Sequence, residues 1–477
     1  MKNPRYLSGL TLCLCTAFGC TGEPGDDTQP TGDSPGDTAT AFLAFDVTPA
    51  VDMPTVMVVT GTSELPLNTW LEVSDDEGAT WTTPALTTEG EEHLHLLRGL
   101  RQDSDYGIRL LGSDGETVHS SATRSVHTGT FDPAPPLVQV EVLDPDTATD
   151  QLTVVTVFQD AASAPHPAIL DSQGRYLWYS ASFETLNTRL SADRSGITVH
   201  RGANGADDDG MLDLVGFDGT RLRSTAVRGS HMTYVEPEPG IYATFGWSVG
   251  TLPEEDRRYA VDTLVEVGID GEQRTLWSPV NEPGILLGEA WTESTYPDDP
   301  EREDWTHFNS LAYDADRHLY IVVSAVLNAV FAVNRSDGTL AWTLEADGGD
   351  FALDDKATLI DRPHSAQLVE GGVLIFNRGP MEGCSEAVEI ALDEHAMQAT
   401  VRWRHVSAEC YSVKWMGQAE RHALGATSIT WATAGVMDQL DSDGSLTRRL
   451  TLQSGGVFGF GEMADSLYPS KPDAGEP

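Results

Sequence analysis

Basic residues are scarce in this sequence. Lys and Arg together number 29 against 74 Asp and Glu, which leaves a formal net charge of −45 over 477 residues. A chain this acidic repels a polyphosphate backbone, so the composition argues against nucleic acid as a partner. The acidic residues are spread along the chain rather than gathered in runs, which indicates a solvated acidic surface.

The N-terminus lacks an apolar run long enough to cross a bilayer. The apolar stretch 7–18 is too short for a stable transmembrane helix, and Lys2 and Arg5 precede it. It ends in Ala-Phe-Gly-Cys20, which resembles a bacterial lipoprotein signal with Cys20 as the lipidated residue. We therefore expect residues 1–20 to be a signal peptide. The protein would be exported and anchored to the membrane by lipid only, in the periplasm or at the cell surface.

An ordinary secretory signal that is cut nearby is the alternative, and it also implies export. Residues 21–40 are rich in Gly, Pro, Asp and Thr and have almost no apolar content. We expect them to form a disordered tether.

Cysteine is scarce as well, with five residues in the whole chain. Cys13 and Cys15 would leave with the signal peptide, and Cys20 would carry lipid. Cys384 and Cys410 remain as the only pair in the mature chain. Because an exported protein matures in an oxidising compartment, we predict one disulfide between them.

Patterns typical of metal and nucleotide sites are missing. Neither mature cysteine lies in a Cys-x-x-Cys arrangement, which makes a zinc site the weaker reading. Two Asp-rich turns, at 207–210 and 441–444, lack the downstream Glu of a calcium loop. No Gly-rich phosphate-binding loop is visible. The sequence thus predicts no metal site and no cofactor.

Residues 41–132 are predicted to form a small β-sandwich. Turn residues separate strand-like runs at 55–59, 70–73 and 93–96. His93 and His95 alternate on one of these strands, and we expect them at the surface. The stretch 97–109, with Tyr106, resembles a fibronectin type III domain, in which a Leu and a following Tyr form the tyrosine corner. The resemblance implies an accessory domain without chemistry, and the Pro-rich segment 133–136 marks its end.

Long helical periodicity is absent beyond residue 137, and an Asp/Gly turn, often followed by Trp, recurs instead. The turns stand roughly 45 to 67 residues apart, at Asp171, Asp218, Asp270, Asp337, Asp393 and Asp441. That spacing suits four short strands and their loops. Six units predict a six-bladed β-propeller over 137–465, followed by a disordered tail, 466–477. Two unrelated β-sandwiches would not explain the shared Asp-Gly…Trp pattern. The predicted fold class is all-β.

Three histidines stand at one point of this repeated unit. His231, His307 and His364 each precede, by roughly ten residues, a turn and a β-branched or aromatic run that is typical of a strand. Equivalent positions of a closed repeat array face the same axis. We therefore expect the three imidazoles to line one mouth of the central channel.

Two strings around these histidines, Asp304-Trp-Thr-His307-Phe-Asn309-Ser and Arg-Pro-His364-Ser-Ala-Gln, are distinctive. Together they resemble the bacterial aryl-sulfate sulfotransferases, periplasmic proteins in which a small β-domain precedes a six-bladed propeller. The resemblance covers nearly all of the mature chain. It implies transfer of a sulfuryl group from an aryl sulfate to a phenolic acceptor, without a nucleotide donor.

The resemblance also implies roles for individual residues. His364 matches the nucleophile that accepts the sulfuryl group and forms a sulfohistidine. His307 and His231 match the histidines that bind sulfate oxygens and assist proton movement, and Asn309 matches a residue of the same pocket. A neutral imidazole suits this step because it does not repel the sulfate, and transfer in two steps predicts ping-pong kinetics.

The sequence departs from the family at one important position. The family places an Arg at the end of the strand that follows the second histidine, and Ala325 stands there in this chain. By register, a guanidinium reappears in the next unit at Arg378. We hypothesise that Arg378 replaces the missing clamp on the sulfate. The alternative is a surface Arg378 that pairs with Glu382 or Glu386. Pro363 also replaces a Gln that is common in the family.

Two other function classes stay open. One is a catalytically inactive, surface-tethered propeller that binds a ligand or partner in its channel, and the other is a structural or adhesive propeller. An assay with an aryl sulfate donor and a phenol acceptor separates the enzyme from both. Nothing in the sequence predicts an oligomeric state.

Overall fold

The computed structural model of the chain describes most of the residues after position 40. The described residues are 41–86, 89–146, 148–201, 210–227, 231, 233–251, 258–282, 302–346, 348–353, 360–380, 383–422 and 425–469. The predicted signal peptide 1–20 with Cys20, the tether 21–40, the Asp-rich turn 207–209 and most of the tail lie outside them. None of the described helices is long and apolar enough to cross a membrane.

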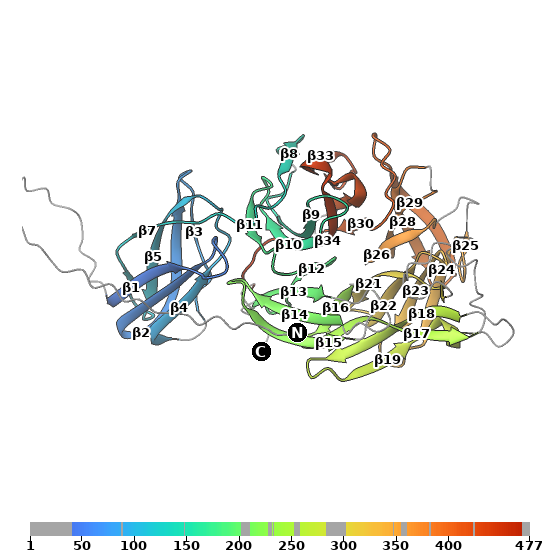
Figure 1. Ribbon diagram of the computed structural model, residues 1–477, viewed down its shortest axis with the longest axis horizontal. Helices are drawn as coiled ribbons and strands as arrows, with labels where there is room; N and C mark the ends of the chain where they lie inside the picture. Colours follow the sequence, from blue (N-terminus) through green and yellow to red (C-terminus); the bar gives the residue numbers. More distant parts are fainter. Residues whose placement is uncertain are drawn as a thin grey trace, which may run out of the picture. The chain divides into compact units, whose positions relative to one another are not determined.

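Six antiparallel sheets follow one another along the chain and form the six blades of a β-propeller, as predicted (Figure 1). From inner to outer strand, blade 1 holds β34 (Val457–Ala464), β9 (Leu152–Phe158), β10 (Pro165–Leu170) and β11 (Tyr176–Tyr179). Blade 2 holds β12 (Thr188–Leu190), β13 (Gly196–Arg201), β14 (Gly210–Gly216) and β15 (Arg221–Val227). Blade 3 holds β16 (Tyr234–Glu238), β17 (Ile241–Thr251), β18 (Arg258–Gly268) and β19 (Gln273–Trp277), with β20 (Arg302–Asp304) beside β18.

The remaining blades repeat this order. Blade 4 holds β21 (Phe308–Asp314), β22 (Leu319–Ser324), β23 (Ala329–Asn334) and β24 (Leu340–Glu345). Blade 5 holds β26 (Pro363–Val369), β27 (Gly372–Asn377), β28 (Glu386–Asp393) and β29 (Gln398–His405), with β25 (Ala352–Leu353) at its edge. Blade 6 holds β30 (Gln418–Arg421), β31 (Thr427–Trp431), β32 (Val436–Leu440) and β33 (Leu446–Leu452). The inner strands β16, β21, β26 and β30 contact one another in that order.

Both ends of the propeller sequence close the ring. The C-terminal strand β34 pairs with β9 and becomes the inner strand of blade 1. At the other end, β8 (Val138–Val142) pairs with β33 and becomes a fifth strand of blade 6, as Figure 1 shows for the teal and red strands. Because the two ends of the chain join neighbouring blades, the ring leaves no open seam between its first and last strands.

The six Asp turns found in the sequence occupy one place in the fold. Each lies between the third and fourth strand of its blade. In the first of them, Asp171 Oδ1 accepts the N–H of Gln173, two residues on, and Gly174 has a positive φ of 75°. Asx turns of this kind form from neighbouring residues alone, and Gly adopts a positive φ without strain. This locality is why the repeat was readable in the sequence.

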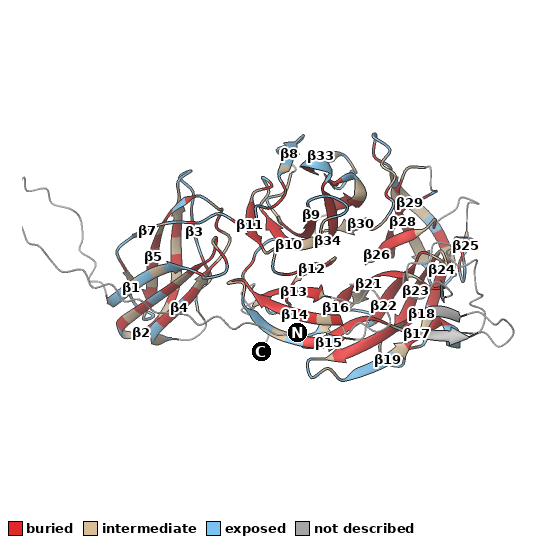
Figure 2. Cartoon of the chain, viewed as in Figure 1, coloured by how far each residue is buried: buried red, intermediate tan, exposed pale blue. Residues whose placement is uncertain are grey.

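Apolar side chains pack between neighbouring blades. Between blades 3 and 4, the rings of Trp277 and Phe308 stack at 5.7 Å, and Phe245 and Phe331 pack against them. Burying one such side chain stabilises the fold by about 1.5–3 kcal/mol. Figure 2 shows most propeller strands as buried. The described part contains no α-helix, only short 3-10 turns at η1 (Pro279–Asn281), η3 (Ala432–Ala434) and η4 (Gln453–Gly455).

The N-terminal strands form a separate seven-stranded sheet with its own core. Its strands are β1 (Phe42–Pro49), β2 (Met57–Asp75), β3 (Thr80–Thr82), β4 (Gly90–Leu97), β5 (Asp105–Ser113), β6 (Val118–Ser120) and β7 (Arg124–His127). The first half of the long β2 pairs with β1 and β4, and its second half pairs with β3 and β5. Tyr106 Oη accepts the N–H of Arg101 at 2.8 Å, as in a tyrosine corner. The fibronectin type III likeness itself stays a prediction.

The prediction that His93 and His95 lie at the surface is wrong. They are 4% and 6% exposed, whereas Leu94 between them is 66% exposed. The rings hydrogen-bond to the hydroxyls of Ser63 and Thr69, at 2.8 and 2.9 Å. These polar partners on β2 make the buried positions acceptable to imidazole.

Candidate functional site

The three histidines come from three consecutive blades. His231 lies three residues before β16, His307 directly before β21, and His364 is the second residue of β26. All three therefore stand where an inner strand begins. The rings of His231 and His307 lie edge to face with centroids 4.9 Å apart. His364 interacts electrostatically with both of them. The structure thus brings the predicted residues together at one end of the channel.

The ladder pairing corrects one detail of the prediction. Strands β21 and β26 each carry a bulge at their second residue, which is Asn309 in β21 and His364 in β26. The residues before the two strands, His307 and Arg362, share positive φ angles of 40° and 52°. His307 is therefore equivalent to Arg362, and His364 to Asn309. The histidines do not share one repeat position, because His364 is the bulge residue, two places further on than the equivalent of His307.

His307 forms a dyad with Asp304 that the sequence analysis did not assign. Its Nδ1 donates to Asp304 Oδ2 at 2.5 Å, and its backbone N–H donates to the other carboxylate oxygen at 3.2 Å. Burial acts to raise the pKa of Asp304, but the hydrogen bond from His307 outweighs it and the pKa lies below its ordinary value. The carboxylate holds the proton on Nδ1, so Nε2 is the nitrogen that can exchange a proton with a substrate. The i, i+3 spacing in the Asp304 string was the available signal.

A second carboxylate braces the segment that carries His307. Asp262 Oδ2 accepts hydrogen bonds from Thr306 Oγ1 and from the backbone N–H of Phe308, both at 2.8 Å. Asp262 is 3% exposed. Because residues on both sides of His307 are tied to β18, the unusual backbone angle at His307 is held by its surroundings.

His364 is oriented by a backbone carbonyl. Its Nδ1 lies 3.1 Å from the carbonyl oxygen of Gly417, and a carbonyl can only accept, so Nδ1 carries the proton. In the neutral ring the lone pair then resides on Nε2. Phe460 of β34 stacks on the imidazole at 5.2 Å. The ring is 6% exposed. This arrangement presents one defined nitrogen as a nucleophile.

The electrostatics keep the imidazoles of His364 and His231 neutral. Burial, followed by the positive charge of Arg378, lowers the pKa of His364 well below its usual value. Burial and the neighbouring His307 lower the pKa of His231 to about 3. Neutral rings offer a lone pair to an electrophile and a single N–H to an anion.

Arg378 is buried within this cluster. It is 3% exposed, so the alternative of a surface arginine is wrong. Its Nε and Nη1 donate to the backbone carbonyls of Arg362 and Lys414, at 3.4 and 3.3 Å. Burial and the like charge of Arg362 lower the pKa of Arg378 to about 9, so it stays charged at neutral pH. Glu386 pairs instead with Arg404, at 2.7 Å, and Glu382 lies outside the described residues.

Asn309 and Ala325 belong to blade 4, the neighbour of the blade that carries His364 and Arg378. Asn309 Nδ2 donates to the carbonyl oxygen of Pro363 at 3.2 Å, which ties blade 4 to the bulge that carries His364. The backbone N–H of Ala325 donates to the carbonyl oxygen of His307 at 3.2 Å, and that of Arg378 donates to Arg362 in the same way. Ala325 and Arg378 are therefore equivalent positions, as the register predicted.

His200 is a further histidine close to the cluster. It lies on β13, is fully buried, and neither ring nitrogen has a hydrogen-bond partner among the described residues. Burial lowers its pKa to about 4. Its charge interaction contributes to the lowered pKa of His231. Nothing in its neighbouring sequence marked it.

The predicted disulfide between Cys384 and Cys410 is confirmed, with Cα atoms 4.8 Å apart. It joins the start of β28 to the segment 406–417 that follows β29. Ser385 fastens the same segment, because its N–H donates to the carbonyl of Tyr411 at 2.7 Å. This anchored segment supplies the carbonyl oxygens that hold His364 and Arg378.

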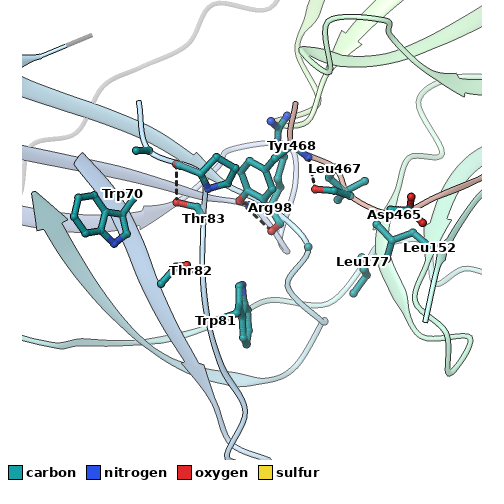
Figure 3. A pocket seen from close by; sticks show the side chains of 14 residues that line it. Trp70, Trp81, Thr82, Thr83, Arg98, Leu152, Leu177, Asp465, Leu467 and Tyr468 are labelled. Carbon is teal, nitrogen blue, oxygen red and sulfur yellow. Dashed lines mark hydrogen bonds between the residues drawn. The ribbon is translucent and has the colours of Figure 1, made fainter. Parts of the chain in front are cut away.

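A cleft of about 770 Å³ lies apart from the histidines. It is lined by Trp70, Trp81, Arg98 and segment 465–468, among others (Figure 3). The Arg98 guanidinium lies 4.3 and 4.4 Å from the ring centres of Phe217 and Tyr468. None of the site histidines lines this cleft.

The Arylsulfotransferase (ASST) family matches residues 138–402, which is more than half of the chain. No curated protein matches the sequence.

Several solved structures match at low similarity. A protein of unknown function from Bacteroides caccae has 14% identity and a TM-score of 0.38, over 67% of this chain and 100% of that one. The Cps50 (Swd1) β-propeller domain of Myceliophteria thermophila has 11% identity and a TM-score of 0.38, over 66% and 96% of the chains. Apo AztD from Citrobacter koseri has 9% identity and a TM-score of 0.33, over 84% and 100%. None of these likenesses bears on function.

Proposed function

The chain belongs to the arylsulfotransferase family, and from this premise we propose that it transfers a sulfuryl group from an aryl sulfate to a phenolic acceptor through a sulfohistidine at His364. The observation that carries the proposal is the hydrogen bond from His364 Nδ1 to the Gly417 carbonyl. It leaves Nε2 as the one nucleophilic nitrogen of a neutral, buried imidazole. Arg378 and two further histidines interact with that ring.

In the first half-reaction, the lone pair of His364 Nε2 attacks the sulfur atom. An N–S bond forms, the S–O bond to the aryl group breaks, and the leaving phenolate takes a proton from Nε2 of His307. Asp304 stabilises the protonated His307 before this transfer and fixes its tautomer afterwards.

In the second half-reaction, the acceptor hydroxyl gives its proton to Nε2 of the now neutral His307. Its oxygen attacks the sulfur, an O–S bond forms, and the N–S bond to His364 breaks. Both histidines return to their starting state, so no nucleotide and no net proton is consumed.

The charge on the sulfuryl oxygens needs donors in both steps. We assign this role to Arg378 and to the N–H of His231, with Asn309 at the edge of the same pocket. Donors fixed in a buried site stabilise a transition state more strongly than they would in water. Arg378 would take the place of the arginine that the family carries at the position of Ala325.

Ala325 also favours a second candidate function. If Arg378 does not serve as the clamp, the site is an anion-binding pocket that holds an aryl sulfate without turning it over. In that case the protein is a surface-tethered binding propeller.

The deciding experiment supplies an aryl sulfate donor without acceptor and maps the modified peptides. We expect one sulfated peptide, the one that contains His364. About one molecule of phenol should be released per molecule of protein. His364→Ala should abolish both. His318→Ala, at the exposed outer end of the neighbouring hairpin, is the matched control and should keep both. An adduct that survives in His364→Ala refutes the assignment.

The absence of any adduct in the wild type, together with saturable aryl sulfate binding, would instead support the binding propeller.

A further inference from the structure

The channel continues inward from the histidines as a cavity of about 280 Å³. The residues that follow the site residues along three inner strands line it: Ser310 after Asn309, Ser365 after His364, and Gln418 after Gly417. Phe460 lines it as well, and the same ring stacks on His364. The cavity is therefore the next layer of the channel below the proposed sulfuryl site.

Most polar side chains around this cavity are committed to holding the blades together. Gln418 exchanges two hydrogen bonds with the backbone of Gly461, at 3.0 and 3.2 Å. Gln367 does the same with the backbone of Arg421, at 3.1 and 2.7 Å. Glu236 accepts the N–H of Gly240 at 2.8 Å. These groups have little capacity left for a ligand.

Three polar groups of the lining keep hydrogen-bonding capacity for a ligand. Ser310 is 6% exposed, and its hydroxyl has no hydrogen-bond partner in the described part of the chain. The same holds for Nε of Arg189, although Nη1 of the same guanidinium forms an ion pair with Glu462 at 3.7 Å. No hydrogen bond or ion pair within the described ranges engages the carboxylate of Glu420. A buried polar atom without a partner is costly, so the Ser310 hydroxyl and Arg189 Nε, with the half-buried Glu420 carboxylate on the same cavity, point to a ligand that would satisfy them.

The charges in the cavity restrict what that ligand can be. Glu236 and Glu420 disfavour an anion, and Arg189 disfavours a cation. Burial is the main cause that raises the pKa of Glu420 to about 7, Arg189 opposes it, and Glu462 adds to it. Near neutral pH, Glu420 can therefore either accept or donate a hydrogen bond. The complementary group is a neutral hydroxyl, which does both.

The volume restricts the ligand further. A cavity of roughly 150 Å³ is enough to take benzene, and pockets for drug-sized ligands run from about 300 to 1,000 Å³. About 280 Å³ therefore suits one aromatic ring with a substituent. Phe460 supplies an aromatic wall for such a ring.

We propose that this cavity is the acceptor subsite and that it selects dihydroxyaryl acceptors, whose first hydroxyl meets the sulfohistidine and whose second hydroxyl bonds to Glu420, Arg189 and Ser310. The proposal rests on the proposed function for the identity of the acceptor. The cavity residues take no part in bond making or breaking. They hold the ring so that the first hydroxyl is placed for attack.

The test compares the binding of hydroquinone and 4-methylphenol, which differ by a hydroxyl and a methyl group of similar size. Calorimetry on the unsulfated protein measures this without any turnover. We expect hydroquinone to bind about tenfold more tightly, as one or two hydrogen bonds to charged groups would give. Glu420→Ala should bring the ratio of the two Kd values to about one. Glu370→Ala, an exposed Glu on the β26–β27 turn, should leave the ratio at its wild-type value.

Ser310→Ala provides a second variant should Glu420→Ala fold poorly, and it should reduce the ratio about threefold. Equal binding of the two phenols by the wild type, or a preference that persists in the variants, overturns the proposed subsite. The His364 adduct assay is independent of these measurements. A missing adduct with an intact hydroquinone preference would refute the transfer reaction and leave the subsite standing.

Discussion

His307 and His364 each have one ring nitrogen hydrogen-bonded to a group that can only accept. For His307 the acceptor is the carboxylate of Asp304, and for His364 it is the carbonyl oxygen of Gly417. Each partner fixes the proton on Nδ1 and leaves Nε2 for the substrate. The carboxylate also stabilises a positive charge on its ring, which suits proton transfer. The carbonyl does so weakly, which suits a neutral nucleophile.

This difference predicts the effect of Asp304→Asn. The amide oxygen can still accept from His307 Nδ1, but the negative charge that stabilises imidazolium is lost. We expect kcat to fall by about 10²–10⁴-fold, the usual contribution of general acid–base catalysis, with a smaller change in KM. Steady-state kinetics with an aryl sulfate and a phenol would measure this. Asp314→Asn, which affects the exposed pair with Arg317, should keep the wild-type kcat. A wild-type kcat in Asp304→Asn would show that the dyad is structural.

Arg378 offers a second prediction at the residue scale. Arg378→Ala should lower kcat/KM at least tenfold, because one charged donor to an oxyanion contributes about 1.5–3 kcal/mol. Arg404→Ala, which breaks the outer pair with Glu386, is the control. The double variant Arg378→Ala with Ala325→Arg should recover activity, because it returns the cation to the position where the family carries it. Unchanged kinetics in the single variant would contradict the clamp.

At the scale of elements, the site depends on how strands begin and where loops are anchored. The bulges at Asn309 and His364 turn equivalent residues of blades 4 and 5 toward the same place. The segment 406–417, which links blade 5 to blade 6, positions groups at the same site. It is held by the Cys384–Cys410 disulfide and delivers the carbonyl that orients His364.

Removing the disulfide therefore has two expected consequences. Replacing both cysteines with Ser should lower the free energy of unfolding by roughly 2–4 kcal/mol, as the loss of a crosslink over a loop of this length does. Urea unfolding would measure this, and reduced wild-type protein should behave like the variant. The folded variant should also show a lower kcat, because the carbonyl of Gly417 is less firmly placed. A kcat equal to the wild type would show that Ser385 alone holds the segment.

At the scale of the whole molecule, buried histidines couple stability to pH. Burial is the main cause that lowers the pKa values of His95, His200 and His422 to about 4, from an ordinary value of 6.5. Below pH 6.5 these histidines bind protons in the unfolded chain, whereas in the folded chain they stay neutral until the pH approaches 4. The unfolded state therefore holds more protons, and stability falls as the pH falls.

We expect the urea midpoint to decrease between pH 6.5 and about 5, above the range in which most carboxylates titrate. His200→Gln should flatten this dependence, because it removes one of the groups responsible. His395→Gln, at an exposed turn, should leave it as in the wild type. A midpoint that stays constant across this range would contradict the buried neutral histidines.

Export and anchoring are also properties of the whole molecule, and we propose both from the Cys20 motif. Cys20→Ala should move the protein from the membrane fraction to the soluble fraction, because the acyl chains that hold it are lost. Fractionation of cells expressing the two forms would measure this. Equal membrane retention would rule out lipidation.

The sequence by itself determined the architecture of the propeller. The six Asp turns rest on hydrogen bonds between residues two positions apart, and all but the turn at Asp393 contain a glycine with positive φ. Such features are encoded by neighbouring residues. The pairing of Cys384 with Cys410 was predicted from the expected oxidising compartment and from the number of cysteines left in the mature chain. The meeting of His231, His307 and His364 followed from the repeat, apart from the one-residue bulge.

Only the tertiary structure decided which polar side chains are buried and what they face. His93 and His95 looked like surface residues, yet Ser63 and Thr69 on the neighbouring strand make them core residues. Arg378 had nearby glutamates to pair with, yet the blade packing buries it beside His364. His200 and the Ser310–Glu420 cavity had no signal in the chain at all. The physical reason is that burial and charge pairing depend on strands from different blades, which are far apart in the sequence and meet only when the ring closes.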